Sequence, residues 1–229
     1  NLSEHFGKKL CLVVHASWWG CRQDLPVWQK IYSELSNYNF TVFSVMEDKN
    51  IDDARPWIEG ANAEFPCTID TEHIVSDLYN MFNVPTIVWI DESGKIVRPN
   101  DVVVMNESGA KLVKVDPEEY IQKIRNWVIN DSNPVSSKDE FIKLKNQRTP
   151  TDKEQLARAE FALGQWLFDN KEISLAGNHF ERATELSPAD IMIQRGTMSM
   201  RGMDPMKDYG PIAGEIIQKG FKLYRPIRD

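Results

Sequence analysis

The stretch that decides the fold is LCLVVHASWWGCRQDLP, residues 10–26. Residues 10–16 form a short apolar run with β-branched members, which is typical of a buried strand. A Trp-Trp-Gly turn follows, and Cys21 closes it. From Arg22 to about Asn37 the apolar positions recur at three- and four-residue spacing, which predicts a helix. Pro26 lies inside that predicted helix and is expected to kink it.

The chain then alternates strands and helices, which is typical of an α/β fold. We expect strands at residues 40–46, 66–69, 86–90 and 95–98, and helices at 51–61, 72–82 and 117–130. A strand-like insertion with its own turn is expected at 102–115. Because strand–helix–strand crossovers are right-handed, the first two strands should lie side by side and parallel.

Two motifs within this part resemble a known family. Residues 16–26 resemble the active-site segment of the TlpA/ResA branch of thioredoxin-like thiol–disulfide oxidoreductases, which typically read Trp-Ala-Ser-Trp-Cys-x-x-Cys-Arg-x-Glu-x-Pro. Asn83-Val84-Pro85-Thr86 stands where that family places its cis-proline. The resemblance implies a thioredoxin-like three-layer sandwich. It also implies that Val84 and Pro85 shape a groove for an extended substrate, which Trp18 is a candidate to line, although packing also explains a tryptophan there.

The resemblance assigns only one of the two redox positions to a cysteine. Dithiol exchange needs an attacking thiolate at a helix N-terminus, where the macrodipole lowers its pKa. A second thiol then resolves the mixed disulfide. Cys21 matches the resolving position, because an Arg-x-acid run follows it as in the family. Two residues earlier, at the spacing of a Sec-Gly-Cys or Cys-x-Cys site, stands Trp19. Since tryptophan cannot attack a disulfide, the dithiol cycle cannot run in the chain as written.

Three explanations of Trp19 stay open. The context Ala16-x-x-Trp19-Gly20-Cys21 resembles ResA-like bacterial selenoproteins that read Trp-Ala-x-x-Sec-Gly-Cys, with His15 in place of the first Trp. Selenocysteine and, in some genetic codes, tryptophan are both read from UGA, so Trp19 is hypothesised to replace a native selenocysteine. Alternatively, the domain is a redox-inactive binding module, or Cys21 does one-cysteine chemistry alone. A peroxidase has less support, because no Thr-x-x-Cys motif precedes the helix.

The second half of the chain has a purely helical period. Residues 131–152 are polar and predict a linker with one short helical segment. Beyond them the pattern resembles a tetratricopeptide helix pair, carried by Leu163-Gly164, Leu167, Ala176, Phe180, Ala183 and Pro188. A lone repeat cannot bury its own face, so we expect it to pack on residues 191–200 or on the first domain. The expected division is 1–130 thioredoxin-like, 131–152 linker and 153–229 small all-α tetratricopeptide-like domain.

Most other reactive side chains have simpler interpretations. Glu47 and Asp48 end the second strand and are expected to be solvated, although related proteins use an acid beneath the active site for proton transfer. Cys11 and Cys67 are expected in core strands, and the methionines after Ala189 in soft packing. The four histidines lack metal-ligand spacing, so neither a metal nor a cofactor is expected.

Composition restricts the partners. The net charge is −7 and no basic stripe carries interleaved aromatics, which argues against nucleic acid. No stretch approaches the ~20 apolar residues of a spanning helix. The chain begins at Asn1, so a signal peptide or lipid anchor could have preceded it. The resemblance favours the periplasm or cell envelope, with the cytoplasm as alternative, and protein thiols or disulfides as substrates. The helical domain is expected to offer a surface for a protein partner.

Overall fold

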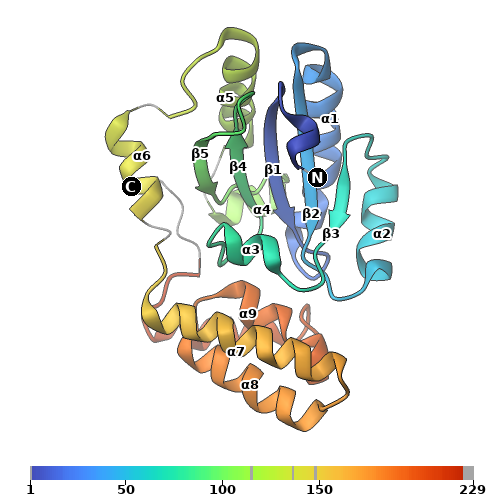
Figure 1. The fold of residues 1–229 in the computed structure, drawn as a ribbon, viewed down its shortest axis with the longest axis vertical. Coiled ribbons are helices and arrows are strands. Elements are labelled where there is room, and N and C mark those ends of the chain that lie inside the picture. The colour runs from blue at the N-terminus through green and yellow to red at the C-terminus, as the bar shows by residue number, and fades with distance from the viewer. Residues whose placement is uncertain (1, 114–115, 136, 147–148, 224–229) are drawn as a thin grey trace.

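The computed structural model describes residues 2–113, 116–135, 137–146 and 149–223. Its N-terminal half holds a five-stranded sheet in the order β3-β2-β1-β4-β5, and its C-terminal part is helical (Figure 1). The strands are β1 (Lys9–His15), β2 (Phe40–Met46), β3 (Cys67–Ile69), β4 (Thr86–Ile90) and β5 (Ile96–Asp101). The α-helices of this half are α1 (Leu25–Leu35), α2 (Ile51–Gly60), α3 (Ile74–Leu78), α4 (Glu107–Val113) and α5 (Pro117–Asn130).

The C-terminal part contains five α-helices in the described residues. They are α6 (Lys138–Asn146), α7 (Asp152–Asp169), α8 (Ile173–Leu186), α9 (Ile191–Gly196) and α10 (Tyr209–Gln218). Short 3₁₀ helices lie at Leu2–His5, Gly20–Asp24, Ser36–Tyr38 and Ser199–Arg201. None of the described helices is long and apolar enough to cross a membrane.

The central strands pair as the sequence predicts. β1 and β2 are parallel, in register from Lys9 opposite Phe40 to His15 opposite Met46. β3 adds a second parallel pair, whereas β4 and β5 run antiparallel. The predicted turn between β4 and β5 is confirmed, and Gly94 there has a φ of +84°. This combination of parallel and antiparallel strands is the thioredoxin-like arrangement.

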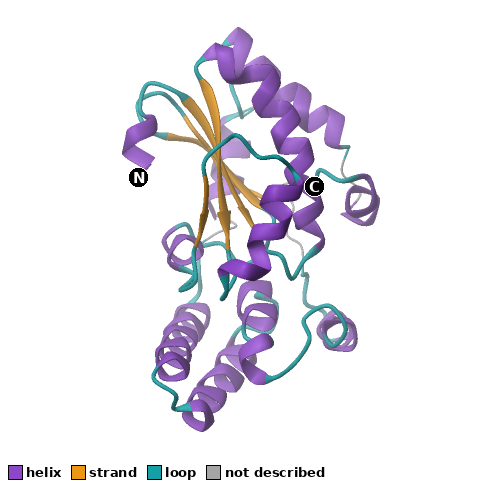
Figure 2. Ribbon diagram, turned by 90° about the vertical axis from the view of Figure 1, so that its right-hand side faces the viewer, coloured by secondary structure: helices purple, strands orange, loops and turns teal. Residues whose placement is uncertain are grey.

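Alternate residues of β1 face opposite sides of the sheet. Cys11 and Val13 pack toward α1 and α5, in a core where Trp89 stacks on Trp127 with ring centroids 4.9 Å apart. Leu12 and Val14 face the other side, together with Met192 from the C-terminal part. Figure 2 shows the sheet nearly edge-on, with helices packed along one face. Cys11 is a core residue, as expected, and Cys67 is half-buried in β3.

The expected kink at Pro26 is wrong. α1 begins at Leu25, so Pro26 stands in its first turn, where the missing N–H has no intrahelical partner to lose. The preceding residues form the 3₁₀ helix Gly20–Asp24 instead of extending α1. The spacing of the apolar residues alone does not distinguish an α-helical turn from a 3₁₀ turn.

The strand expected at 102–115 is also wrong. Residues 102–105 are buried but belong to no strand, and α4 follows them; residues 114–115 lie outside the described residues. Asn106 begins this helix, because its side-chain Oδ1 accepts from the backbone N–H of Gly109 at 2.9 Å. Val103 and Met105 pack into the core beneath α1, which explains an apolar, β-branched run without strand pairing. The helix expected at 72–82 is shorter too: α3 ends at Leu78, and Asn80, two residues later, has a φ of +52°.

The helices α7 and α8 form the hairpin that the sequence predicts. A capping box at Thr151 starts α7: its hydroxyl accepts from the backbone N–H of Glu154, and the Glu154 carboxylate accepts from the backbone N–H of Thr151. The helices approach closely where Gly164 faces the fully buried ring of Phe180. Ile193 and Met200 complete this core, so the pair packs on the following segment as expected.

The helical part also packs on the thioredoxin-like part. Arg158 of α7 donates to the backbone carbonyl of Met81 at 2.9 Å and forms an ion pair with Asp77 of α3. The backbone N–H of Ile191 donates to the carbonyl of Phe82 at 2.8 Å. These contacts place α9 against the loop that precedes β4.

The close contact at Gly164 gives a test of the hairpin. A Cβ added there would lie 2.6 Å from the Phe180 ring, which is fully buried and cannot move aside. We expect Gly164→Ala to lower the free energy of unfolding by about 1–2 kcal/mol. Gly177→Ala in α8 is the matched control, because its Cβ meets nothing within 4 Å. The control should gain up to about 1 kcal/mol from helix propensity. Equal effects of both variants in urea unfolding would contradict the packing.

Candidate active site

The candidate site is the segment that joins β1 to α1. The chain leaves β1 at His15, turns through Ala16 to Trp19 and enters the 3₁₀ helix Gly20–Asp24. The Trp19 N–H donates to the carbonyl of Ala16 at 3.3 Å, which closes the turn. Cys21 is therefore held in the first turn of helical structure, two residues after Trp19.

The end of β2 anchors this segment from below. The backbone N–H of Ser17 donates to both carboxylate oxygens of Asp48, at 3.2 and 3.0 Å, and the Ser17 hydroxyl donates to the same carboxylate. The indole N–H of Trp18 donates to the carbonyl of Glu47 at 2.8 Å. The prediction that Glu47 and Asp48 are solvated is wrong: both are buried, because β2 is an inner strand whose end lies beneath the active-site turn.

Cys21 is fully buried. Its thiol donates to the carbonyl of Ala16 at 3.6 Å. Burial raises the pKa of the Cys21 thiol far above its ordinary value, and the carboxylates of Asp24 and Asp48 add to the rise. The thiol is therefore protonated at neutral pH, and a protonated thiol is a poor nucleophile.

Asp24 lies three residues after Cys21 and is also fully buried. Its Oδ1 accepts from the backbone N–H and from the side-chain amide of Asn106, both at 2.7 Å. Burial raises the pKa of Asp24 to about 6, and these hydrogen bonds oppose the rise. Asn106 was missed from the sequence because residues 102–115 were expected to form a strand.

The expected groove residues lie beside Cys21. The peptide bond between Val84 and Pro85 is cis, and both residues are buried. Val84 and Cys21 share one apolar cluster, and Trp18 and Trp19 pack at its edge. The structure thus brings together Trp18, Trp19, Cys21 and Val84, with Pro85 next in the chain.

One residue of the site comes from the helical part and was not found from the sequence. Arg195 of α9 is only 2% exposed, and its guanidinium lies 4.1 Å from the ring centroid of Trp19, 4.8 Å from that of Tyr209 and 5.7 Å from that of Trp18. Tyr209 in turn meets Trp19 edge-on, with centroids 6.2 Å apart. A lone arginine in a weakly patterned, methionine-rich stretch carries no sequence motif.

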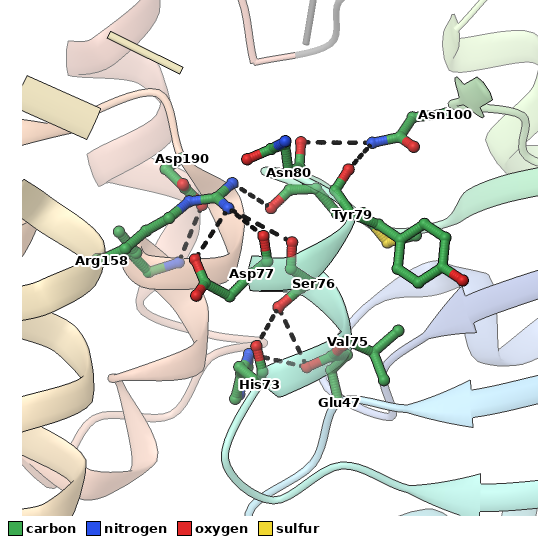
Figure 3. Close-up of polar contacts among 12 residues, drawn as sticks. Glu47, His73, Val75, Ser76, Asp77, Tyr79, Asn80, Asn100, Arg158 and Asp190 are labelled. Atoms are coloured by element: carbon green, nitrogen blue, oxygen red, sulfur yellow. Dashed lines mark hydrogen bonds and ion pairs between the residues drawn. The ribbon is translucent and has the colours of Figure 1, made fainter. Parts of the chain in front are cut away.

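A second buried polar group lies at the junction of the two parts (Figure 3). The His73 Nδ1 is 3.0 Å from the Glu47 carboxylate, and the Ser76 hydroxyl donates to that carboxylate at 3.5 Å. Burial lowers the pKa of His73 to about 4, so its uncharged form is favoured at neutral pH, and burial raises the pKa of Glu47. His73 meets Phe161 of α7 edge-on, which joins this pair to the helical part.

A cleft of about 370 Å³ opens beside this junction, between α3 and the helices α7 and α9. Three large side chains on its lining, Ile74, Leu78 and Trp166, are more than half exposed. The described residues include no cluster of three or more histidine, cysteine or carboxylate side chains that could hold a metal ion.

Comparisons with known proteins match the N-terminal half of the chain. The model of the AhpC/TSA family matches residues 1–98. The N-terminal half of the chain has a thioredoxin-like fold. "Probable nucleoredoxin 1" of Arabidopsis thaliana is 29% identical over 122 residues, which are 49% of this chain and 20% of that protein. The chain therefore spans about a fifth of the length of this curated relative.

Solved structures of thiol–disulfide proteins are also similar. A protein of Chlorobium tepidum described as a thiol:disulfide interchange protein DsbE is 27% identical; the match covers 49% of this chain and 79% of that chain, with a TM-score of 0.43. A secreted disulfide oxidoreductase of Mycobacterium tuberculosis is 16% identical, over 47% of this chain and 80% of that chain, with a TM-score of 0.40.

The raised pKa of Asp24 predicts a pH dependence of stability. Its folded-state pKa of about 6 lies above the ordinary 3.8, so the protonated form of Asp24 stabilises the folded state. This contribution to the free energy of unfolding is complete below about pH 4 and is lost as the pH rises through 6. Asp24→Asn keeps an oxygen acceptor for Asn106 but cannot ionise. We expect the variant to gain on the order of 2 kcal/mol over the wild type between pH 4 and pH 7.5. Urea unfolding at both pH values measures this, and a stability difference independent of pH would contradict it.

Proposed function

We propose that this protein derives from a thiol–disulfide or selenol–disulfide oxidoreductase whose attacking residue stands at position 19. One observation carries the proposal: Cys21 lies at the start of helical structure, in one cluster with Val84 of the cis-proline loop, and position 19 is at the rim of that cluster. The side chain at position 19 is partly buried and lies nearer to solvent than the fully buried Cys21.

The proposed exchange has two steps. A thiolate or selenolate at position 19 attacks a substrate disulfide; the substrate S–S bond breaks, and the released sulfur takes up a proton. The Cys21 thiol then loses its proton and attacks the mixed bond, which releases the second substrate sulfur. The substrate is reduced, and residues 19 and 21 are left joined in an oxidised bond. Reverse steps oxidise a dithiol substrate, and external dithiols or disulfides reset the pair.

The hypothesis that Trp19 replaces a native selenocysteine rests on the Sec-Gly-Cys spacing and on the shared UGA codon. Sequencing codon 19 in the source genome tests it directly. Any codon other than UGA there removes recoding as the explanation.

The setting of the reaction is proposed from the resemblance. We infer a protein disulfide or thiol substrate, bound in extended form along the loop of Val84 and Pro85, with Trp18 at its edge. We infer the periplasm or cell envelope as the compartment, with the cytoplasm as alternative. The division at residues 130 and 152, the tetratricopeptide-like character of the helical part and its protein partner stay predictions.

A second candidate function is a redox-inactive protein-binding module. The packing of Trp19 against Arg195 and Tyr209 favours it, since the indole fills the space in front of the guanidinium. In this case the cis-proline loop holds a partner without exchanging disulfides.

Restoring a thiol at position 19 separates these functions. We expect the chain as written to be nearly inert in insulin reduction, because Trp19 cannot attack and Cys21 is buried and protonated. Trp19→Cys should gain dithiol exchange, measured as insulin reduction or as exchange with oxidised glutathione.

Trp19→Ser is the matched control, because it opens the same space without a sulfur. A folded Trp19→Cys protein that performs no exchange would refute the oxidoreductase proposal and leave the binding module.

A further inference from the structure

Arg195 is a charged side chain of the helical part that reaches the active-site segment. It lies between the rings of Trp18, Trp19 and Tyr209, and its Nη2 donates to the carbonyl of Pro205 at 2.5 Å. This places the guanidinium against the residue that stands at the attacking position.

The charged and titratable groups around residues 19 and 21 come from four elements. Arg22 and Asp24 follow in the 3₁₀ helix, Asp48 lies just after β2, His15 ends β1 and Tyr209 begins α10. The carboxylates of Asp24 and Asp48 raise the pKa of the Cys21 thiol, whereas the charge of Arg195 lowers it. Burial lowers the pKa of His15 to about 4, so this side chain is neutral at pH 7.

A buried guanidinium is costly unless it meets suitable partners. Arg195 meets three aromatic rings and a backbone carbonyl, and these contacts offset part of that cost. Unlike an apolar side chain, a positive charge at this point stabilises an anion at a neighbouring atom.

We propose that Arg195 is a positioning residue that holds the thiolate or selenolate at position 19 beside Cys21. The inference rests on the proposed function, because it requires sulfur or selenium at position 19. In the present chain the Trp19 indole covers the face of the guanidinium, and a smaller Cys or Sec side chain would leave that face to the anion. The helical part thereby supplies a positive charge at the face of residue 19, whereas Arg22 of the thioredoxin-like part lies over the ring of Trp57 and donates to the carbonyl of Ser17.

The pKa of a thiol at position 19 tests the proposal. The background is Trp19→Cys with Cys21→Ser, and the reaction is alkylation by iodoacetamide across pH, read by mass spectrometry of the peptide that contains residue 19. Burial raises the pKa of Cys67 to about 11 and that of Cys11 well above its ordinary value, so neither thiol competes at neutral pH.

We expect Arg195→Gln to raise the pKa of the thiol at position 19 by about 1 or more. Arg195→Lys should restore most of the lower value, because it keeps the charge. Arg182→Gln is the matched control: it removes the same charge from an exposed position of α8 and should leave the pKa unchanged.

If Arg195→Gln fails to fold, Arg195→Met keeps an apolar stem that packs well on aromatic rings and removes the charge together with the donor to Pro205. A thiol pKa that is the same in the parent and in either folded, uncharged variant would overturn the proposal. Insulin reduction by Trp19→Cys is measured separately. Loss of exchange with an Arg195-dependent thiol pKa would refute the proposed function alone.

Discussion

The parallel pairing of β1 with β2 is the constraint on which the rest of the site depends. It brings the ends of both strands to one edge of the sheet, so Asp48 lies beneath the turn that leaves β1. The carboxylate then accepts the otherwise unpaired backbone N–H of Ser17, and Trp18 is tied to the neighbouring carbonyl. A turn held this way from below has a fixed direction when it enters the 3₁₀ helix, which sets where residue 19 and Cys21 point. A slip of β2 by one residue would carry Asp48 away and leave this backbone donor without its acceptor.

The helical part completes the site and does more than extend the chain. Met192 enters the apolar cluster that contains Cys21, and burying one such side chain contributes about 1.5–3 kcal/mol. The hydrogen bond from Ile191 to Phe82 fixes α9 beside the loop of the cis-proline, and the side-chain amide of Asn83 donates to the carbonyl of Leu223 at 2.7 Å. Both sides of the candidate groove, the active-site turn and the proline loop, therefore contact residues from beyond position 190. The surroundings of both segments depend on the position of the helical part.

Local pattern predicts most of the sheet and the helix hairpin, because strands of alternating burial and helices of regular period leave direct marks in the sequence. The candidate active-site segment and the proline loop are also marked in the sequence, since their motifs are short and contiguous. The failures have one cause. Glu47, Asp48, Asn106 and Arg195 acquire their roles from contacts with distant segments, and nothing beside them in the chain indicates those contacts. The apolar run at 102–105 was assigned to a strand because burial beneath α1 and burial in a sheet give the same composition.

The surroundings of Cys21 suit a resolving residue better than an attacking one. A resolving thiol reacts only after the mixed disulfide has formed, so it need not be ionised at rest. Burial and two carboxylates keep its proton in place, which protects the thiol from oxidation by solvent species until a substrate is bound. When the mixed disulfide forms, the proton needs an acceptor, and a carboxyl with a pKa of about 6, as in Asp24, has a suitable affinity near neutral pH. The inertness of Cys21 in the present chain is therefore compatible with exchange chemistry, and residue 19 determines whether there is a mixed disulfide for it to resolve.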